Sequence, residues 1–206
     1  MIYQSKVEPT CTDDGYTIYV CKDCGQQHKD DYVPPLLADF VYTGTANQYT
    51  ITGLINSNKT EYIIPNGVIN IADNVFAGCY NLNNITLPST LKAIGQSAFN
   101  TCTSLKSINI PEGVQAIRSN TFANCEFLEK ITFNESLMQI DEKAFDQCKK
   151  LREVVLPKTV TKIGPDAFRN CYSISKLFIP KTVTSMGKYN GVNLTHFTKS
   201  EDGFTF

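Results

Sequence analysis

The chain of 206 residues is poor in histidine, which limits the chemistry that it can perform. Its two histidines are His28 and His196, and the sequence shows no serine, histidine and aspartate arrangement around a nucleophile elbow. A glycine-rich phosphate-binding loop is also missing. Carboxylates such as Glu112, Asp141 and Glu142 fall at variable positions, where solvated surface charge is the simplest interpretation. The sequence therefore predicts a protein that is not an enzyme.

The chain also lacks an excess of either charge and a long apolar run. Its 19 lysines and arginines stand against 20 aspartates and glutamates, a net charge of -1. This balance argues against nucleic acid or an anionic membrane as a partner. No run of eighteen apolar residues exists, so we expect no membrane insertion in this segment. Residues 1–11 lack the pattern of a secretory signal, which does not by itself establish a cytoplasmic location.

What the chain does have is a strict period of 23 residues, from Glu61 to Gly187. Three columns define it, a phenylalanine, a cysteine three residues later, and a leucine or isoleucine three residues after that. Isoleucine, valine or leucine, and proline form further columns, with Asn134 as the one exception to proline. The cysteines are Cys79, Cys102, Cys125, Cys148 and Cys171, and the phenylalanines are Phe76, Phe99, Phe122, Phe145 and Phe168.

Each unit predicts the same local structure. It begins with a strand such as residues 107–110, where apolar and polar residues alternate, and the proline that follows ends the strand. A short arm such as residues 114–117 comes next, and the spacing around alanine, phenylalanine and cysteine predicts a brief helical or 3₁₀ turn. One unit cannot bury its own apolar columns, but stacked units can. The sequence therefore predicts a repeat solenoid with a parallel sheet on one side and an irregular opposite side.

The flanks of the solenoid predict different structures. We expect a small cysteine-containing module in residues 1–35, a β-hairpin N-terminal cap in 36–64, the solenoid in 65–187, and a C-terminal cap or tail in 188–206. Terminal units need atypical caps because their core faces are otherwise open. Phe197, Phe204 and Phe206 either cover the last core face or belong to a loose tail.

The repeated pattern I-x-L-P-x-x-L-x-x-I-x-x-x-A-F-x-x-C-x-x-L resembles the BspA-like leucine-rich repeats of bacterial cell-surface proteins. This resemblance implies a curved leucine-rich-repeat solenoid whose parallel strands line the concave face. It also implies an extracellular or cell-surface location and a role in adhesion. The fold transfers better than the activity, because one fold serves many functions.

The N-terminal cysteines allow three interpretations. Cys11, Cys21, Cys24 and His28 supply the ligands of a tetrahedral structural zinc site, although only one C-x-x-C knuckle is present. A disulfide that staples a small segment and free thiols are the two alternatives. The surrounding motif resembles small cysteine modules that accompany such repeats in gut-bacterial surface proteins. No other part of the chain predicts a cofactor, and the repeat cysteines are expected to be buried structural thiols.

A binding surface is expected where outward strand positions of successive units lie side by side. The candidate residues fall in the later units, where Val155 and Phe178 suggest an exposed apolar patch. The alternative for Phe178 is that it packs under the C-terminal tail. The partner would be a protein or a glycan, and the alternative function is a passive spacer in a larger surface protein. The predicted site consists of Lys130, Thr132, Glu153, Val155, Lys176 and Phe178.

Overall fold

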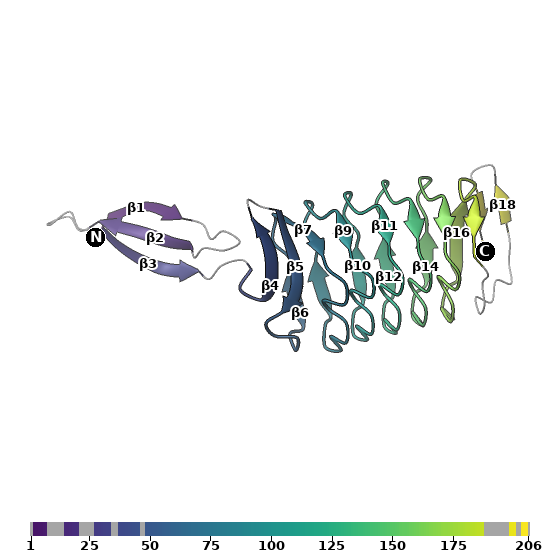
Figure 1. Cartoon of the computed structure of the whole chain (residues 1–206), viewed down its shortest axis with the longest axis horizontal. Coiled ribbons are helices and arrows are strands. Elements are labelled where there is room, and N and C mark those ends of the chain that lie inside the picture. Colours follow the sequence, from purple (N-terminus) through teal and green to yellow (C-terminus); the bar gives the residue numbers. More distant parts are fainter. Residues whose placement is uncertain are drawn as a thin grey trace.

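Residues 61–187 form a solenoid, in which the chain winds through successive coils of one 23-residue unit each (Figure 1). The computed structural model describes residues 2–7, 15–20, 27–33, 37–45, 48–187, 198–200 and 203–205, and these contain strands and turns but no helix. Each coil has two short strands, one in a front layer and one in a rear layer, and each layer is divided into two hydrogen-bonded sheets. The predicted repeat solenoid is therefore confirmed.

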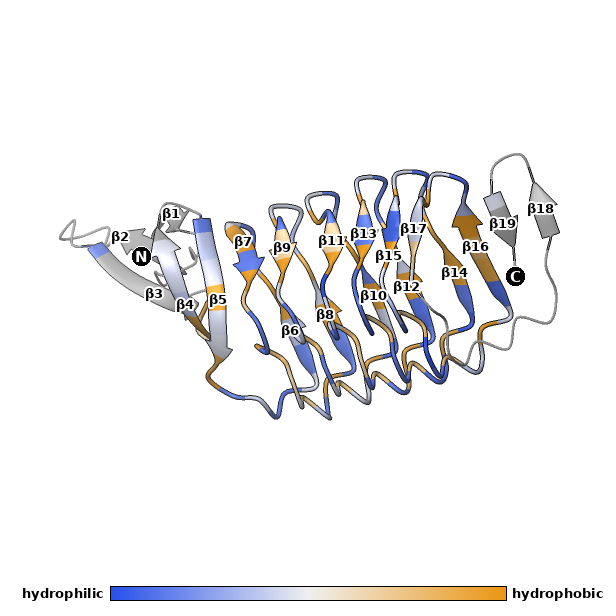
Figure 2. Ribbon diagram, turned by 45° about the vertical axis from the view of Figure 1, so that its right-hand side comes forward, coloured by the Kyte–Doolittle hydropathy of each residue, from blue (hydrophilic) through white to orange (hydrophobic). Residues whose placement is uncertain are grey.

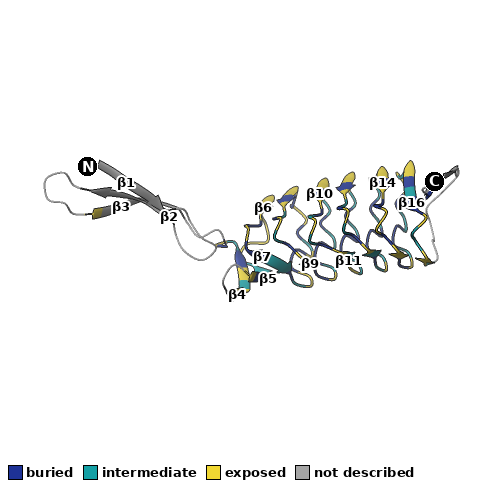
Figure 3. Cartoon of the chain, turned by 90° about the horizontal axis from the view of Figure 1, so that it is seen from above, coloured by how far each residue is buried: buried dark blue, intermediate teal, exposed yellow. Residues whose placement is uncertain are grey.

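The first strand of each coil belongs to the front layer, called the front sheet below, in which the first two strands and the last four form separate hydrogen-bonded ladders. In β8 and β10 the middle residue is buried and the two outer residues are exposed (Figure 3), which is the alternation that the sequence predicted. Strands pair in parallel and are offset by one unit, as in Glu61 with Asn84 and Lys130 with Glu153. The front strands are β6 (Glu61–Ile63), β8 (Asn84–Thr86), β10 (Ser107–Asn109), β12 (Lys130–Thr132), β14 (Glu153–Val155) and β16 (Lys176–Pro180).

The second strand of each coil forms a rear sheet, and the prediction of an irregular side is wrong here. Its fully buried isoleucines, such as Ile117 and Ile140, lie opposite each other in parallel register. Because no unit carries an insertion, these short segments pair in register, first β7 with β9 and then β11 through β17, with an interruption between β9 and β11. The rear strands are β7 (Val68–Ile71), β9 (Ala93–Ile94), β11 (Ala116–Ile117), β13 (Gln139–Ile140), β15 (Lys162–Ile163) and β17 (Ser185–Met186).

The segment around each phenylalanine is a turn, and the predicted helical or 3₁₀ conformation is wrong. In the coil of Phe122, Asn120 and Asn124 have left-handed φ values of 56° and 61°, which a right-handed helix cannot contain. Backbone N–H groups also alternate in direction. The N–H of Ala123 donates to Asn120 O within the turn, whereas the N–H of Phe122 donates to the carbonyl of Ala144 in the next coil at 2.8 Å. Bonds between coils thus replace the bonds of a helix.

Further strands precede and follow the coils. The hairpin of β4 (Phe40–Thr45) and β5 (Gln48–Leu54) extends the rear sheet, because β5 pairs with β7. Beyond the last coil, β19 (Gly203–Thr205) pairs antiparallel with both β16 and β18 (Thr198–Ser200). A separate antiparallel sheet contains β1 (Ile2–Val7), β2 (Gly15–Val20) and β3 (Gln27–Val33). The boundaries of the four predicted parts stay predictions.

The phenylalanine column forms the centre of the core. All five rings are fully buried, and neighbouring rings are nearly parallel with centroids 5.0 to 5.4 Å apart. This spacing corresponds to offset stacking, the favoured arrangement for parallel rings. At the N-terminal end, the Tyr62 ring meets Phe76 edge-on at 5.3 Å and also contacts Phe40 of β4 at 5.6 Å. The first core face is thus closed by aromatic contacts.

The cysteine column satisfies buried backbone carbonyls. The Cys125 thiol donates to the carbonyl of Phe99 in the preceding coil at 3.2 Å, and Cys102, Cys148 and Cys171 make the equivalent bonds. The same carbonyl also accepts the N–H of the cysteine in its own coil, as Phe99 O does from Cys102. All five repeat cysteines are free and buried. A small apolar side chain with one weak donor fits this place.

Asn134 replaces the column proline and performs a different task. Its side-chain amide donates to the carbonyls of Pro111 at 2.7 Å and Val114 at 2.9 Å. In three other coils the corresponding carbonyl accepts a threonine hydroxyl placed two residues after the proline. These bonds join Thr90 to Val68, Thr159 to Leu137 and Thr182 to Val160. Ser136 occupies the threonine position of this unit, but its hydroxyl donates to Glu112 at 3.2 Å, so the Asn134 amide supplies the donor to the Val114 carbonyl instead.

We expect Asn134→Pro, which restores the repeat consensus, to lower the free energy of unfolding by about 1–3 kcal/mol, because it leaves the buried Val114 carbonyl without its donor. The double variant Asn134→Pro with Ser136→Thr should recover most of this loss, since a threonine at this position directs its hydroxyl to the corresponding carbonyl in three other coils, whereas the Ser136 hydroxyl bonds Glu112. Urea unfolding monitored by circular dichroism measures both. A single variant as stable as the parent chain would show that the amide bonds contribute nothing.

We also expect the protein to lose stability above pH 9. Burial raises the pKa of Cys125 from 9.0 to about 12, and it also raises the pKa values of Cys79, Cys102 and Cys148. The unfolded chain releases these protons first, so the stabilisation is complete below pH 9 and disappears as the pH rises towards 12. The slope is up to about 1.4 kcal/mol per pH unit for each thiol. Urea titrations between pH 8 and 10 test this, and Cys125→Ala should have a shallower slope; equal slopes would contradict it.

Candidate functional site

The six residues predicted for binding lie side by side on the front face, by which we mean the exposed side of the front sheet. Register places Glu153 opposite Lys130 on one side and Lys176 on the other, and it places Val155 opposite Phe178. Five of the six side chains are exposed, and Phe178 is half-buried. The apolar end of β16 lies beside β14 (Figure 2). The structure therefore brings these residues together, while their role in binding stays a prediction.

A hollow of about 620 Å³ lies on this face at β12 and β14. A smaller hollow of about 240 Å³ adjoins it and shares Phe133, Glu135 and Val155. Together they reach every predicted residue except Lys176. The larger hollow is lined by Glu129, Lys130, Ile131, Thr132, Phe133, Glu135, Arg152, Glu153 and Val155, and the smaller one extends to Leu156, Pro157, Lys158 and Phe178.

Charges around the larger hollow are partly paired. Lys176 contacts Glu153 at 2.7 Å and Arg152 contacts Glu129 at 3.9 Å, each across one unit of the solenoid. Lys130 and Glu135 form no ion pair with any residue that the structure describes. Exposed pairs contribute little to stability, so these side chains remain free to reorient towards a ligand. Among the described side chains, the hollow thus offers one ammonium group and one carboxylate, Lys130 and Glu135, that are in no ion pair.

The sequence did not predict Phe133 and Glu135 as site residues. Phe133 occupies a column in which the other units have isoleucine or leucine, and its ring is too large to be covered completely. It contacts Phe145 edge-on at 6.0 Å and remains half-buried beside Val155. Phe133 and Asn134 are consecutive residues, and both differ from the repeat consensus. The hollow therefore lies where the sequence departs from the repeat. Comparing units for such departures could have found it.

Phe178 is less accessible than Val155, which is 51% exposed. Its backbone pairs with Thr205 of β19, and a Cβ atom at Gly203 would lie 3.0 Å from Phe178 Cζ. The ring therefore packs against the strand that follows the last coil. This contact favours the interpretation of Phe178 as part of the C-terminal covering and leaves Val155 as the main exposed apolar side chain.

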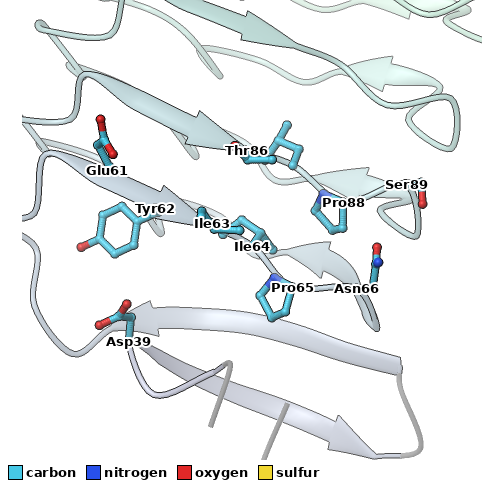
Figure 4. Close-up of a pocket in the computed structure, with 11 residues that line it drawn as sticks. Asp39, Glu61, Tyr62, Ile63, Ile64, Pro65, Asn66, Thr86, Pro88 and Ser89 are labelled. Carbon is cyan, nitrogen blue, oxygen red and sulfur yellow. The ribbon is translucent and has the colours of Figure 1, made fainter. Parts of the chain in front are cut away.

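A further hollow of about 840 Å³ lies at the opposite end of the front sheet (Figure 4). It is lined by β6, by the start of the following arm at Ile64–Asn66, by residues 86–89 and by Asp39. Ile63 points outward here and is 75% exposed. The sequence did not single out Ile63, although it occupies the same strand position as Val155. Apolar side chains are therefore exposed at both ends of the front face.

The lining residues of the hollows at β12–β16 include no histidine, cysteine or serine. Among the described side chains, no cluster of His, Cys, Asp or Glu is arranged to hold a metal ion. Cys11, Cys21 and Cys24 lie outside the described residues, and only the backbone of His28, in β3, is described. Structural zinc at these four residues stays a prediction. In the part of the chain that the structure describes, no helix could span a membrane.

The chain is similar to several bacterial leucine-rich-repeat proteins of known structure. The Treponema pallidum leucine-rich-repeat protein is 30% identical, with a TM-score of 0.65 over 72% of this chain and 79% of that one. A protein from Bacteroides ovatus is 29% identical, with a TM-score of 0.61 over 77% of this chain and 41% of that one. A protein from Eubacterium ventriosum is 25% identical, with a TM-score of 0.50 over 71% of this chain and 47% of that one. The chain thus spans less than half of the last two proteins, and no curated protein matches it.

The family model described as the BspA type leucine-rich repeat region matches residues 69–195 with six copies. This range covers more than half of the chain and includes nearly all of the coils. Leucine-rich-repeat solenoids generally serve non-catalytic roles, and this family membership suggests a protein-interaction module. The sequence match and the coil geometry agree, and the chain therefore belongs to the BspA type leucine-rich repeat family.

Proposed function

We propose that the chain is a non-catalytic adhesion or binding module of a bacterial surface or secreted protein, and that it holds a protein or glycan partner on the front face at β12, β14 and β16. The observation that carries this proposal is the hollow at β12 and β14, where exposed Val155 lies among charged side chains. A recess that combines apolar surface with a few polar groups is the usual form of a binding site. Family membership supports the surface location.

The arrangement of the site fits non-covalent recognition. Val155 and Phe133 provide an apolar centre, and Lys130, Glu135 and Glu153 provide a polar rim, as in protein interfaces. Val155 belongs to β14, which pairs in parallel with β12 and β16, and Phe133 directly follows β12. A partner would therefore not need to order the site on binding, which lowers the entropic cost of association.

We expect Val155→Ser to weaken partner binding by about tenfold, equivalent to about 1.4 kcal/mol, and to leave the melting temperature nearly unchanged because the side chain is exposed. Met138 lies outside the front face, immediately before β13, and is 49% exposed, so Met138→Ser is the matched control. Partners are first identified on arrays of extracellular-matrix proteins and glycans, and affinities are then measured by surface plasmon resonance.

Lys130→Glu provides a second variant at the same hollow. It reverses the charge of Lys130 without removing apolar surface. The loss of affinity for the array partner should therefore be larger at low ionic strength than at high ionic strength. If Val155→Ser and Lys130→Glu both bind the array partner as tightly as the parent chain, the proposed site is wrong. If no array partner binds at all, the passive spacer becomes the better description of this module.

A further inference from the structure

The front strand β6 has a hydrogen-bonded neighbour on one side only among the described strands. It pairs with β8, while the preceding hairpin of β4 and β5 joins the rear sheet through β7 instead. The last front strand differs, because β19 covers the outer edge of β16 with an antiparallel pairing. The outer edge of β16 is therefore paired with another strand, whereas the outer edge of β6 is open within the described part of the chain.

The hydrogen bonds of β6 show which of its backbone groups face this open edge. The N–H of Ile64 donates to Thr86 O at 2.9 Å, and Thr60 O accepts the N–H of Asn83 at 2.8 Å. Backbone groups of successive strand residues point alternately to the two sides. Because Thr60 and Ile64 point towards the next coil, Glu61 and Ile63 direct their N–H and C=O groups away from it. An unpaired strand edge of this kind is a template for another strand.

Side chains at the same edge form a recess beside these backbone groups. The hollow of about 840 Å³ includes Glu61, Ile63 and Asp39 in its lining (Figure 4). Ile63 is 75% exposed and offers an apolar contact. Asp39 is already paired with Lys59, whereas Glu61 has no ion pair with any described residue. The recess thus combines an apolar surface with the Glu61 carboxylate, for which the described part of the chain provides no ion pair.

We propose that the edge of β6 binds an extended peptide segment of a partner protein by strand addition. The segment pairs with the N–H and C=O groups of Glu61 and Ile63, places an apolar side chain on Ile63 and places a lysine or arginine near Glu61. In this binding mode, backbone hydrogen bonds supply affinity and alternate side chains supply specificity. This site lies at the opposite end of the front sheet from the hollow at β12 and β14. The two sites share no residues, so each proposal can be tested independently of the other.

The first test asks whether the edge is open in the complete chain. Proline removes the backbone N–H and is tolerated only at an unpaired strand edge. Ile63→Pro should therefore leave the melting temperature nearly unchanged. Thr132 occupies the same position in β12, but its edge is paired with Asn109 of β10, so Thr132→Pro places a residue without an N–H against a bonded strand and should lower the melting temperature strongly. Equal destabilisation by the two prolines would mean that the chain itself occupies the edge, which overturns the proposal.

The second test uses a peptide of about eight alternating valine and lysine residues as the probe and the full chain as the receptor. We expect the peptide to protect the amides of Glu61 and Ile63 from hydrogen exchange, as followed by NMR. Fluorescence anisotropy should show binding at least about tenfold weaker for Ile63→Pro, or when alternate peptide nitrogens are methylated. Val155→Ser should bind the peptide normally, which separates this site from the front-face hollow.

Three results would overturn the proposal. They are no binding of the peptide, binding that neither methylation nor Ile63→Pro weakens, and protection that appears elsewhere in the chain. Analytical ultracentrifugation of the free chain tests whether a second copy occupies the edge. If the free chain forms dimers that Ile63→Pro dissociates, the edge is occupied by a second copy of the chain and not by a partner peptide.

Discussion

Backbone hydrogen bonding between corresponding segments of successive coils is the constraint on which the rest of this structure depends. It operates in the front sheet, in the rear sheet and in the turns, where the N–H of Phe122 donates to Ala144 O and the N–H of Asn124 donates to Asp146 O. Each such bond requires the same local conformation in both coils. The left-handed residues on either side of each phenylalanine follow from this requirement, because they direct alternate N–H groups along the solenoid axis and prevent a helix.

The regular displacement from one coil to the next also determines how residues meet in the core and on the surface. Phenylalanine rings stack on their equivalents, cysteine thiols bond to the preceding coil, and acidic residues such as Glu126 meet a basic residue one unit later, here Lys149 at 2.8 Å. A residue therefore contacts mainly its own coil and the two neighbouring coils, as in other quasi-one-dimensional proteins. A unit can differ from the consensus where another side chain makes the same contact. The Asn134 amide, for example, donates to the carbonyl that accepts a threonine hydroxyl in other coils. The front face can consequently vary without loss of the fold.

The front strands and the core columns could be predicted because periods of two and 23 residues are visible in the sequence. The rear sheet could not, since a two-residue strand such as β11 is too short to show alternation. Left-handed positions were hidden because Lys143 and Gln147 adopt them as well as asparagine. The candidate face was located from outward positions, but the hollow was not, because it depends on the size of Phe133. The open edge at β6 depends on which sheet the preceding hairpin joins, and this is not encoded in any local pattern.

The central claim, that register between coils determines the fold, is tested most directly by comparing two deletions. Removing residues 106–128 deletes one whole unit and joins Leu105 to Glu129, which preserves every column. Removing residues 106–117 deletes about half a unit and displaces every later column from the columns that precede the deletion, so the two parts of the solenoid no longer match at their junction. Circular dichroism during thermal unfolding should show a cooperative transition for the larger deletion and none for the smaller one. A smaller deletion that unfolds as cooperatively as the larger one would contradict this account.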